Sequence, residues 1–155
     1  MANRKYPYYP AWDAGHASPV ILKCVELCQK RWKVSNLGTY ASRPVRNPAA
    51  KGALSVHATG FACDMGADIA TLQKMWDWFI AHSEELKLAE AHFYKMPNTK
   101  YGAGYRCSRG PGKAGVVKYA TAAESAGPGG LWLHIELEEQ DPAHFEEVFR
   151  ALKPA

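Results

Sequence analysis

The most informative stretch of the chain reads Ser55-Val56-His57-Ala58-Thr59-Gly60-Phe61-Ala62-Cys63-Asp64. A histidine and a carboxylate stand on either side of Gly60, and glycine adopts left-handed backbone angles at little cost. A tight turn at Gly60 can therefore bring an imidazole nitrogen of His57 and a carboxylate oxygen of Asp64 to one ion, at about 2.0–2.2 Å. Zinc needs a third protein ligand, and a catalytic site leaves the fourth position open for water.

A second segment, residues 131–137, supplies the best candidate for that third ligand. It is an apolar run, typical of a strand, with His134 at its centre. Side chains alternate between the two faces of a strand, so Trp132, His134 and Glu136 share one face. A histidine and a glutamate are costly to bury there without partners. Either histidine by itself is more often a hydrogen-bonded core residue, so the two segments alone make His57, Asp64 and His134 candidate ligands of one zinc ion.

The rest of the chain predicts helices near both ends and in the middle, with strands between them. Apolar residues repeat at helical spacing after three capping residues, Ser18, Asp68 and Asp141. The expected helices run from 19 to about 33, from 68 to about 82, and onward from 141. Strands are expected at 39–40, 86–94, 116–119 and 131–137, with loops at 44–52 and 101–115 and a turn at 127–130. This order predicts an α+β fold, a small antiparallel sheet flanked by helices, in one domain over residues 1–155.

Composition and charge describe an ordinary folded protein. Charged residues make up 22% of the chain and the formal net charge is +4. The basic residues form loose clusters rather than the dense stripe or reading module of a nucleic-acid binder, so we expect no nucleic-acid partner. The four cysteines lack the second close pair of a zinc ribbon and are expected to be structural thiols of a reducing compartment.

The N-terminal segment and the hydropathy of the sequence indicate the expected location of the protein. Residues 1–10 are polar and broken by proline, without the apolar stretch of a signal peptide. No apolar run is long enough to span a bilayer, so we expect no stable membrane insertion. We therefore expect synthesis in the cytoplasm, and we expect a monomer.

The motif Ser-x-His-x-x-Gly-x-Ala-x-Asp of residues 55–64, followed about seventy residues later by a Trp-x-His strand, resembles a family of zinc enzymes. It is similar to the zinc D-alanyl-D-alanine carboxypeptidases and L-alanyl-D-glutamate endopeptidases, which include bacteriophage endolysin domains and are related in fold to the hedgehog signalling domain. All the fixed positions of the first motif match, and the resemblance extends over roughly residues 36–137. It implies a hedgehog-like fold, Zn²⁺ held by His57, Asp64 and His134, and a peptidoglycan stem peptide containing D-residues as the substrate.

The resemblance also implies roles near the metal. Arg43 falls where the family usually places an arginine that holds the substrate carbonyl or its developing oxyanion, and Arg46 is a near rival for that role. A guanidinium suits it because it stays charged and presents several donors. Ser55 either orients a ligand, contacts the substrate or only stabilises the turn.

One departure from the family concerns the general base. Many members carry a glutamate three residues before the last histidine, where this chain has Leu131, which cannot transfer a proton. Glu136 is the nearest carboxylate on the strand face of His134, and it could serve as the base or only fix the His134 ring. His92 is a further proton-transfer candidate if its strand lies beside that of His134.

Two further segments carry glycine and aromatic residues. Segment 101–115 predicts a mobile flap beside the active site, from which Tyr101, Tyr105 and Arg106 can contact a substrate; a bare surface loop is the alternative. Its Gly-x-Gly does not lead from a parallel strand into a helix, which argues against a dinucleotide site. The aromatic residues of segment 6–12 are expected to pack over the core rather than to grip sugar rings.

Three hypotheses follow from these features. The first is a zinc-dependent peptidoglycan peptidase of the endolysin type, phage-encoded and acting on the host cell wall after release through membrane holes made by another protein. The second is a catalytically silent, zinc-stabilised binding domain of the same fold, which Leu131 favours. The third is a basic structural or nucleic-acid-associated protein in which the two histidines are incidental.

Overall fold

The computed structural model describes residues 3–44, 53–122, 124 and 130–154. Within these ranges the chain combines α-helices with one sheet, which confirms the expected α+β class. The α-helices are α1 (Pro19–Trp32), α2 (Ile69–Ala81) and α3 (Pro142–Ala151). Three short 3₁₀ helices stand between strands: η2 (Val56–Thr59), η3 (Cys107–Arg109) and η4 (Gly112–Gly115).

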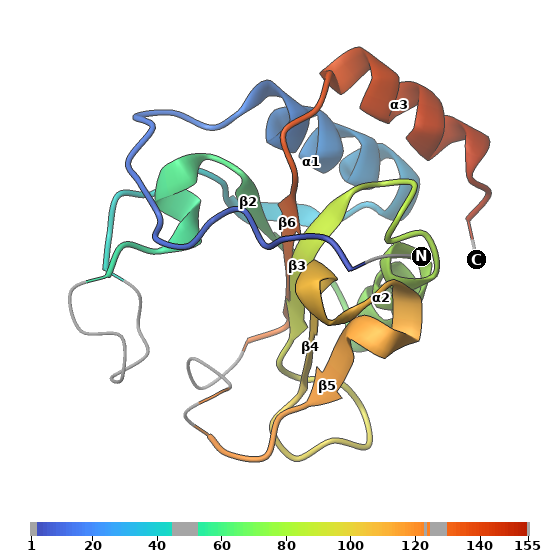
Figure 1. Cartoon of the computed structure of the whole chain (residues 1–155). Helices are drawn as coiled ribbons and strands as arrows, with labels where there is room; N and C mark the ends of the chain where they lie inside the picture. The colour runs from blue at the N-terminus through green and yellow to red at the C-terminus, as the bar shows by residue number, and fades with distance from the viewer. Residues whose placement is uncertain (1–2, 45–52, 123, 125–129, 155) are drawn as a thin grey trace.

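Six strands form one open antiparallel sheet. They are β1 (Ser35–Gly38), β2 (Ala62–Gly66), β3 (Leu88–Phe93), β4 (Ala103–Arg106), β5 (Val116–Lys118) and β6 (Trp132–Leu137). Their order across the sheet is β1-β2-β6-β3-β4-β5, so the last strand in sequence is inserted at the centre (Figure 1). This insertion places β6 directly beside both β2 and β3, which come from much earlier in the chain.

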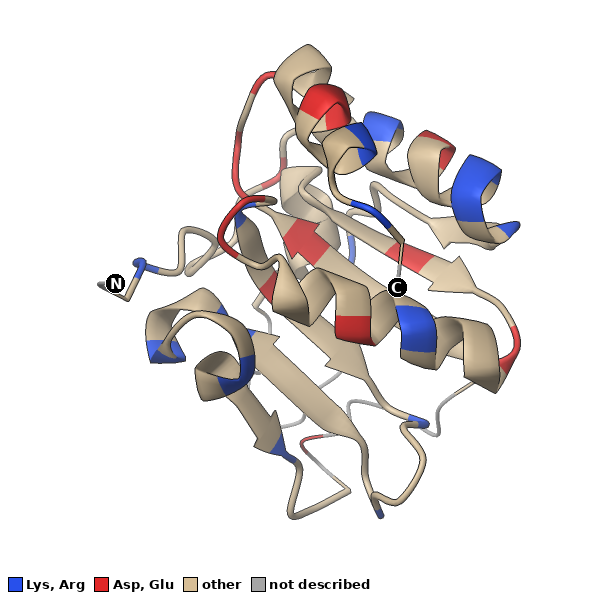
Figure 2. Cartoon of the chain, turned by 90° about the vertical axis from the view of Figure 1, so that its right-hand side faces the viewer, with Lys and Arg blue, Asp and Glu red and all other residues tan. Residues whose placement is uncertain are grey.

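The three α-helices begin at the caps that the sequence indicates. The side chains of Ser18, Asp68 and Asp141 each accept a hydrogen bond from a backbone N–H of the first turn. All three helices lie on one side of the sheet, which faces the viewer in Figure 2. There α1 and α2 contact the strands and α3 packs against α1.

Alternation along the strands divides the sheet into an apolar face and a polar one. The face under the helices carries fully buried residues such as Cys63, Ala91 and Ile135, which belong to one continuous core. The opposite face carries His134 and Glu136 at its centre, and both are buried although they are polar. It is covered by η2 and by residues 3–17, which we call the N-terminal arm.

Two segments differ from the expectation drawn from sequence. The first edge strand is β1 at Ser35–Gly38, which pairs with β2, instead of residues 39–40; the carbonyl of Thr39 is bonded by the side chain of His57. The segment 101–115 is not a flap: Ala103–Arg106 forms β4 inside the sheet, and η3 and η4 follow it. Of the expected loop at 44–52 and the turn at 127–130, residues 45–52 and 127–129 lie outside the described residues.

Charges of both signs are interleaved on the helical side of the molecule (Figure 2). Lys23 of α1, for example, pairs with Glu26 at 3.1 Å and with Glu146 of α3 at 3.2 Å. Partly exposed pairs of this kind contribute little to stability individually. Lys23 therefore has acidic partners on both α1 and α3. Among the described residues, no helix is long and apolar enough to cross a membrane.

Candidate metal centre

His57 is positioned by the short helix η2, which is capped at both ends. The Ser55 hydroxyl accepts a hydrogen bond from the His57 backbone N–H at 3.3 Å, and Gly60 ends the helix with a φ of 80°. A Cβ at Gly60 would also collide with the backbone carbonyl of His16, so both the angle and the space require glycine. Ser55 is itself buried, and of the roles considered for it the structure shows the turn-stabilising one.

The ring of His57 is oriented by a backbone carbonyl. Its Nδ1 lies 2.6 Å from the Thr39 carbonyl oxygen, which can only accept, so Nδ1 carries the proton. The lone pair of Nε2 is then free to bind a cation, and this nitrogen lies 3.1 Å from Asp64 Oδ2. Fixing the tautomer of a histidine through its second nitrogen is the usual way in which proteins prepare an imidazole ligand.

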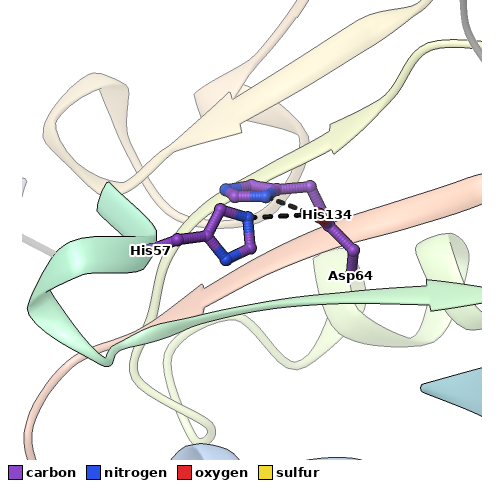
Figure 3. Close-up of side chains that lie close together, drawn as sticks. All are labelled: His57, Asp64 and His134. Carbon is purple, nitrogen blue, oxygen red and sulfur yellow. Dashed lines mark hydrogen bonds and ion pairs between the residues drawn. The ribbon is translucent and has the colours of Figure 1, made fainter. Parts of the chain in front are cut away.

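Asp64 and His134 face each other across neighbouring strands. They are paired directly in the register between β2 and β6, so their side chains lie on the same face of the sheet. Asp64 Oδ1 is 2.9 Å from His134 Nδ1, and the dashed lines of Figure 3 show that both imidazoles interact with Asp64.

These three side chains can hold a metal ion. Their ligand atoms all lie within 4.8 Å of one another, and the two histidines are buried. Two imidazoles and one carboxylate form a donor set that zinc uses in catalytic sites, where it keeps a fourth position open. The expected convergence of the glycine-hinged segment with the strand 131–137 is therefore present.

The pKa values of this cluster reflect its hydrogen bonds. Burial alone would raise the pKa of Asp64, but the hydrogen bond from His134 and the proximity of His57 outweigh burial and hold that pKa well below its ordinary value. Burial likewise would lower the pKa of His134, but its bonds to Asp64 and Glu136 raise that pKa well above the ordinary value. The proton on His134 Nδ1 therefore occupies the place beside Asp64 that a bound cation would take.

Glu136 supports His134 from the side opposite Asp64. Its Oε2 lies 2.7 Å from His134 Nε2, whereas Asp64 lies at Nδ1 of the same ring. Its Oε1 accepts a hydrogen bond of 2.5 Å from the Tyr6 hydroxyl. Burial and the neighbouring Glu90 raise the pKa of Glu136. Of the two roles considered for Glu136, this position favours fixing the His134 ring, because the carboxylate lies at Nε2, the ring nitrogen opposite the one that faces Asp64.

His92 lies directly beside the centre, as its candidacy for proton transfer requires. It is paired with His134 in the register between β3 and β6, and the two ring centroids are 5.2 Å apart. Its Nδ1 is hydrogen-bonded to the Tyr119 hydroxyl, and its Nε2 lies 3.5 Å from Glu90 Oε1. His92 thus has the arrangement of an oriented imidazole with a carboxylate nearby. His92, His134 and Glu136 also form a second group whose ligand atoms lie within 4.8 Å of one another.

Glu90 and Arg106 extend the polar face away from the metal ligands. The guanidinium donates to Glu90 Oε1 from Nη2 at 2.8 Å and from Nε at 3.1 Å. Burial alone would raise the pKa of Glu90, but His92 and Arg106 outweigh it and lower that pKa. In this connected network three carboxylates, Asp64, Glu90 and Glu136, face one guanidinium. With neutral histidines the imbalance is two negative charges, which one divalent cation would offset.

Other residues expected at the site lie elsewhere or touch it only indirectly. Tyr105 is fully buried under the helices, on the opposite face of the sheet, so it cannot contact a substrate at the centre. The expected substrate contact of Tyr105 is wrong because Ala103–Arg106 is a strand of the sheet, and its alternation turns Tyr105 to the apolar face. Arg106 faces the correct side, but its guanidinium is occupied by Glu90. The Arg43 carbonyl accepts a hydrogen bond of 2.9 Å from Ser55 N, which places Arg43 beside the His57 turn. Arg46 lies outside the described residues.

Three neighbours of the centre, Glu90, Tyr119 and Tyr6, do not follow from the motif. Glu90 could have been found, because it shares the alternation of His92 on a predicted strand. Tyr119 reaches His92 only because Gly104 leaves room: a Cβ there would overlap the Tyr119 hydroxyl. Tyr6 is 130 positions from the glutamate that it binds, and no local pattern connects them.

The chain was also compared with known proteins. No protein-family model, no curated protein and no solved structure matches it. The case for its function therefore depends on the geometry of the metal centre and on the resemblance of its motif.

Proposed function

We propose that this chain is a zinc-dependent peptidase that cleaves a peptide bond in the stem peptide of bacterial peptidoglycan. The proposal includes the hedgehog-like fold of the D-alanyl-D-alanine peptidases, monomeric action and an endolysin-type setting, without nucleic-acid or stable membrane contact. The observation that carries it is the convergence of His57, Asp64 and His134. These are the three positions at which the motif resemblance implies zinc ligands.

The residues present fit zinc in number, type and protonation. Zinc bound there would polarise the substrate carbonyl and lower the pKa of a water molecule to about 7. His57 offers Nε2, because its Nδ1 is held by the Thr39 carbonyl. His134 offers Nδ1, because its Nε2 is held by Glu136. Asp64 lies within reach of both imidazoles and supplies the negative charge that a dication requires.

Of the two proton-transfer candidates, we assign the proton transfer to His92, because its Nε2 is not bonded to a metal-ligand side chain as the Glu136 carboxylate is. When its Nδ1–H is donated to the Tyr119 oxygen, Nε2 presents a lone pair that can accept a proton from the attacking water. Glu90 lies 3.5 Å from that nitrogen and would stabilise the imidazolium until the proton passes to the leaving amine. Arg43, in the position that the family resemblance implies, would stabilise negative charge on the substrate oxygen.

A second function is favoured by two specific observations. Leu131 stands where many family members have their glutamate, and it is half-exposed and cannot move a proton. Both oxygens of Glu136 are hydrogen-bonded, and its carboxylate lies at His134 Nε2, the ring nitrogen opposite the proposed zinc position. The alternative is a catalytically silent domain in which zinc stabilises the fold and the face around it binds a wall peptide.

Incubation with purified peptidoglycan separates the two functions. The zinc-loaded chain should release new amino termini, His134→Ala should abolish the release, and His144→Ala should leave it unchanged because His144 is an exposed residue of α3. Zinc binding with peptidoglycan sedimentation but without release would support the silent domain instead. Absence of zinc binding would contradict both.

Variants of the two proton-transfer candidates test the mechanism further. We expect His92→Gln to keep zinc but to lose most of the release, since a positioned acid–base group contributes about 10²- to 10⁴-fold. An unchanged rate in His92→Gln would remove His92 from the mechanism. Glu136→Gln should act mainly through weaker zinc binding, so its rate at saturating zinc should approach that of the wild type.

A further inference from the structure

The N-terminal arm crosses the polar face of the sheet and is tied down at both ends. Near its start, Arg4 Nη2 donates to the Leu88 carbonyl at 2.8 Å. Near its end, the Ala14 backbone N–H donates to the Ala58 carbonyl at 2.8 Å, inside the helix that carries His57. The arm therefore connects the start of β3 with η2 and passes the metal centre between them (Figure 1).

Tyr6 is the residue of the arm that reaches the centre. Its hydroxyl donates to Glu136 Oε1 at 2.5 Å, and its ring lies against the Arg106 guanidinium, 4.2 Å from centroid to Cζ. Burial, followed by the charges of Glu136 and Glu90, raises the pKa of Tyr6, so the phenol keeps the proton that it donates. Because Glu136 is only 1% exposed, no water would replace this hydrogen bond easily.

A continuous chain of hydrogen bonds runs from Tyr6 to the metal ligands. Tyr6 holds Oε1 of Glu136, Oε2 of Glu136 lies 2.7 Å from His134 Nε2, and His134 Nδ1 faces Asp64. A carboxylate on the second nitrogen of a ligand histidine fixes its tautomer and raises its basicity. A carboxylate held at both oxygens cannot rotate away from that nitrogen.

We propose that Tyr6 is a positioning residue of the metal centre, through which the N-terminal arm sets the affinity for zinc. Its hydroxyl keeps Glu136 in the orientation that prepares His134 as a ligand. The proposal rests on the zinc site of the proposed function, but not on cleavage of any peptide bond.

The same contacts argue against a second cation at His92, His134 and Glu136. The two groups share His134. With its Nδ1 assigned to the first ion, a second ion would have to break the 2.7 Å bond between His134 Nε2 and Glu136 Oε2 on which the proposal depends. The proposal therefore requires one zinc ion per chain.

Zinc affinity, measured by competition with a chromophoric chelator, tests the proposal without any substrate. Removing an outer-shell partner of a metal ligand typically costs about 10- to 100-fold in affinity. We expect Glu136→Gln to lose an amount in this range and Tyr6→Phe to lose about tenfold, the lower end. Tyr9→Phe is the matched control, because Tyr9 belongs to the same arm but is 76% exposed.

The double variant distinguishes positioning from simple support of the fold. If Tyr6 acts through Glu136, adding Tyr6→Phe to Glu136→Gln should weaken zinc binding little further. Equal affinities for Tyr6→Phe and Tyr9→Phe, fully additive losses in the double variant, or two zinc ions per chain would each overturn the proposal. A change in the thermal stability of Tyr6→Phe with unaltered zinc affinity would also overturn it.

Failure of this proposal and failure of the proposed function give different results. A wild-type chain that binds no zinc contradicts the metal centre and the role of Tyr6 together. A chain that binds zinc with the expected pattern among variants but releases nothing from peptidoglycan contradicts the peptidase alone.

Discussion

Removal of the metal should make the stability of the protein fall as the pH rises above about 6.5, the ordinary pKa of histidine. His134 is responsible, because its hydrogen bonds to Asp64 and Glu136 raise its pKa in the folded protein despite burial. A raised pKa means that the folded state holds a proton that the unfolded chain has already released. The stabilisation is therefore complete below the unfolded pKa and is lost as the pH rises towards the folded one.

The slope of the unfolding free energy against pH follows from the one proton that His134 keeps in the folded state. Between the two pKa values the free energy of unfolding should fall by about 1.4 kcal/mol per pH unit. In a domain of this size 1 kcal/mol corresponds to about 2–4 °C in Tm, so the expected fall is roughly 3–5 °C per pH unit. Solvent screening does not reduce this slope, because His134 is only 8% exposed.

The assay is urea unfolding in the presence of a chelator, at several pH values between 6.5 and 8.5. His134→Gln should remove the slope, and the exposed control His144→Gln should keep it. Saturating zinc should remove the fall in the wild type, because the cation then takes the place of the proton. A metal-free wild type whose stability is flat or rises over this range would refute the assigned hydrogen bonds.

Three other substitutions test the framework of the site. Gly60→Ala should cost about 1–3 kcal/mol in unfolding free energy and lower zinc occupancy, because the residue has a φ of 80° and no room for a Cβ; unchanged chemical denaturation would contradict this. Gly104→Ala should displace Tyr119 from His92 and reduce peptide release while zinc binding persists. Release at the wild-type rate would show that Tyr119 has no role in the mechanism. Tyr105→Phe should change stability by less than about 1.5 kcal/mol and leave release intact, since its buried hydroxyl has no hydrogen-bond partner among the described residues; a loss of release would restore its predicted substrate contact.

The three candidate ligands, His57, Asp64 and His134, could be predicted because each lies in a segment with a strong local signal and because the motif of residues 55–64 resembles that of a zinc family. Gly60 marks the turn after His57, and alternation in the strand of His134 shows which side chains share its face. Helix caps such as Ser18 and Asp68 are equally local, since the hydroxyl or carboxylate bonds to its own first turn. Turns, strand faces and helix caps, which depend on residues a few positions away in the sequence, could thus be predicted.

The remaining features depend on contacts between distant segments. The glycine pattern of residues 101–115 is typical of a loop, but β4 forms there because its edges pair with β3 and β5. Gly104 allows Tyr119 to approach the sheet closely and does not make the segment mobile. The role of Glu136 could not be chosen from sequence, because it depends on which His134 nitrogen it faces and on the arm residue Tyr6.

The most direct test of the account is the position of zinc in crystals of the zinc-loaded protein, located by anomalous scattering at the zinc absorption edge. We predict one peak per chain, at about 2.0–2.2 Å from His57 Nε2, a carboxylate oxygen of Asp64 and His134 Nδ1. A peak bound through His134 Nε2 and Glu136, or no peak between the two histidines, would contradict it.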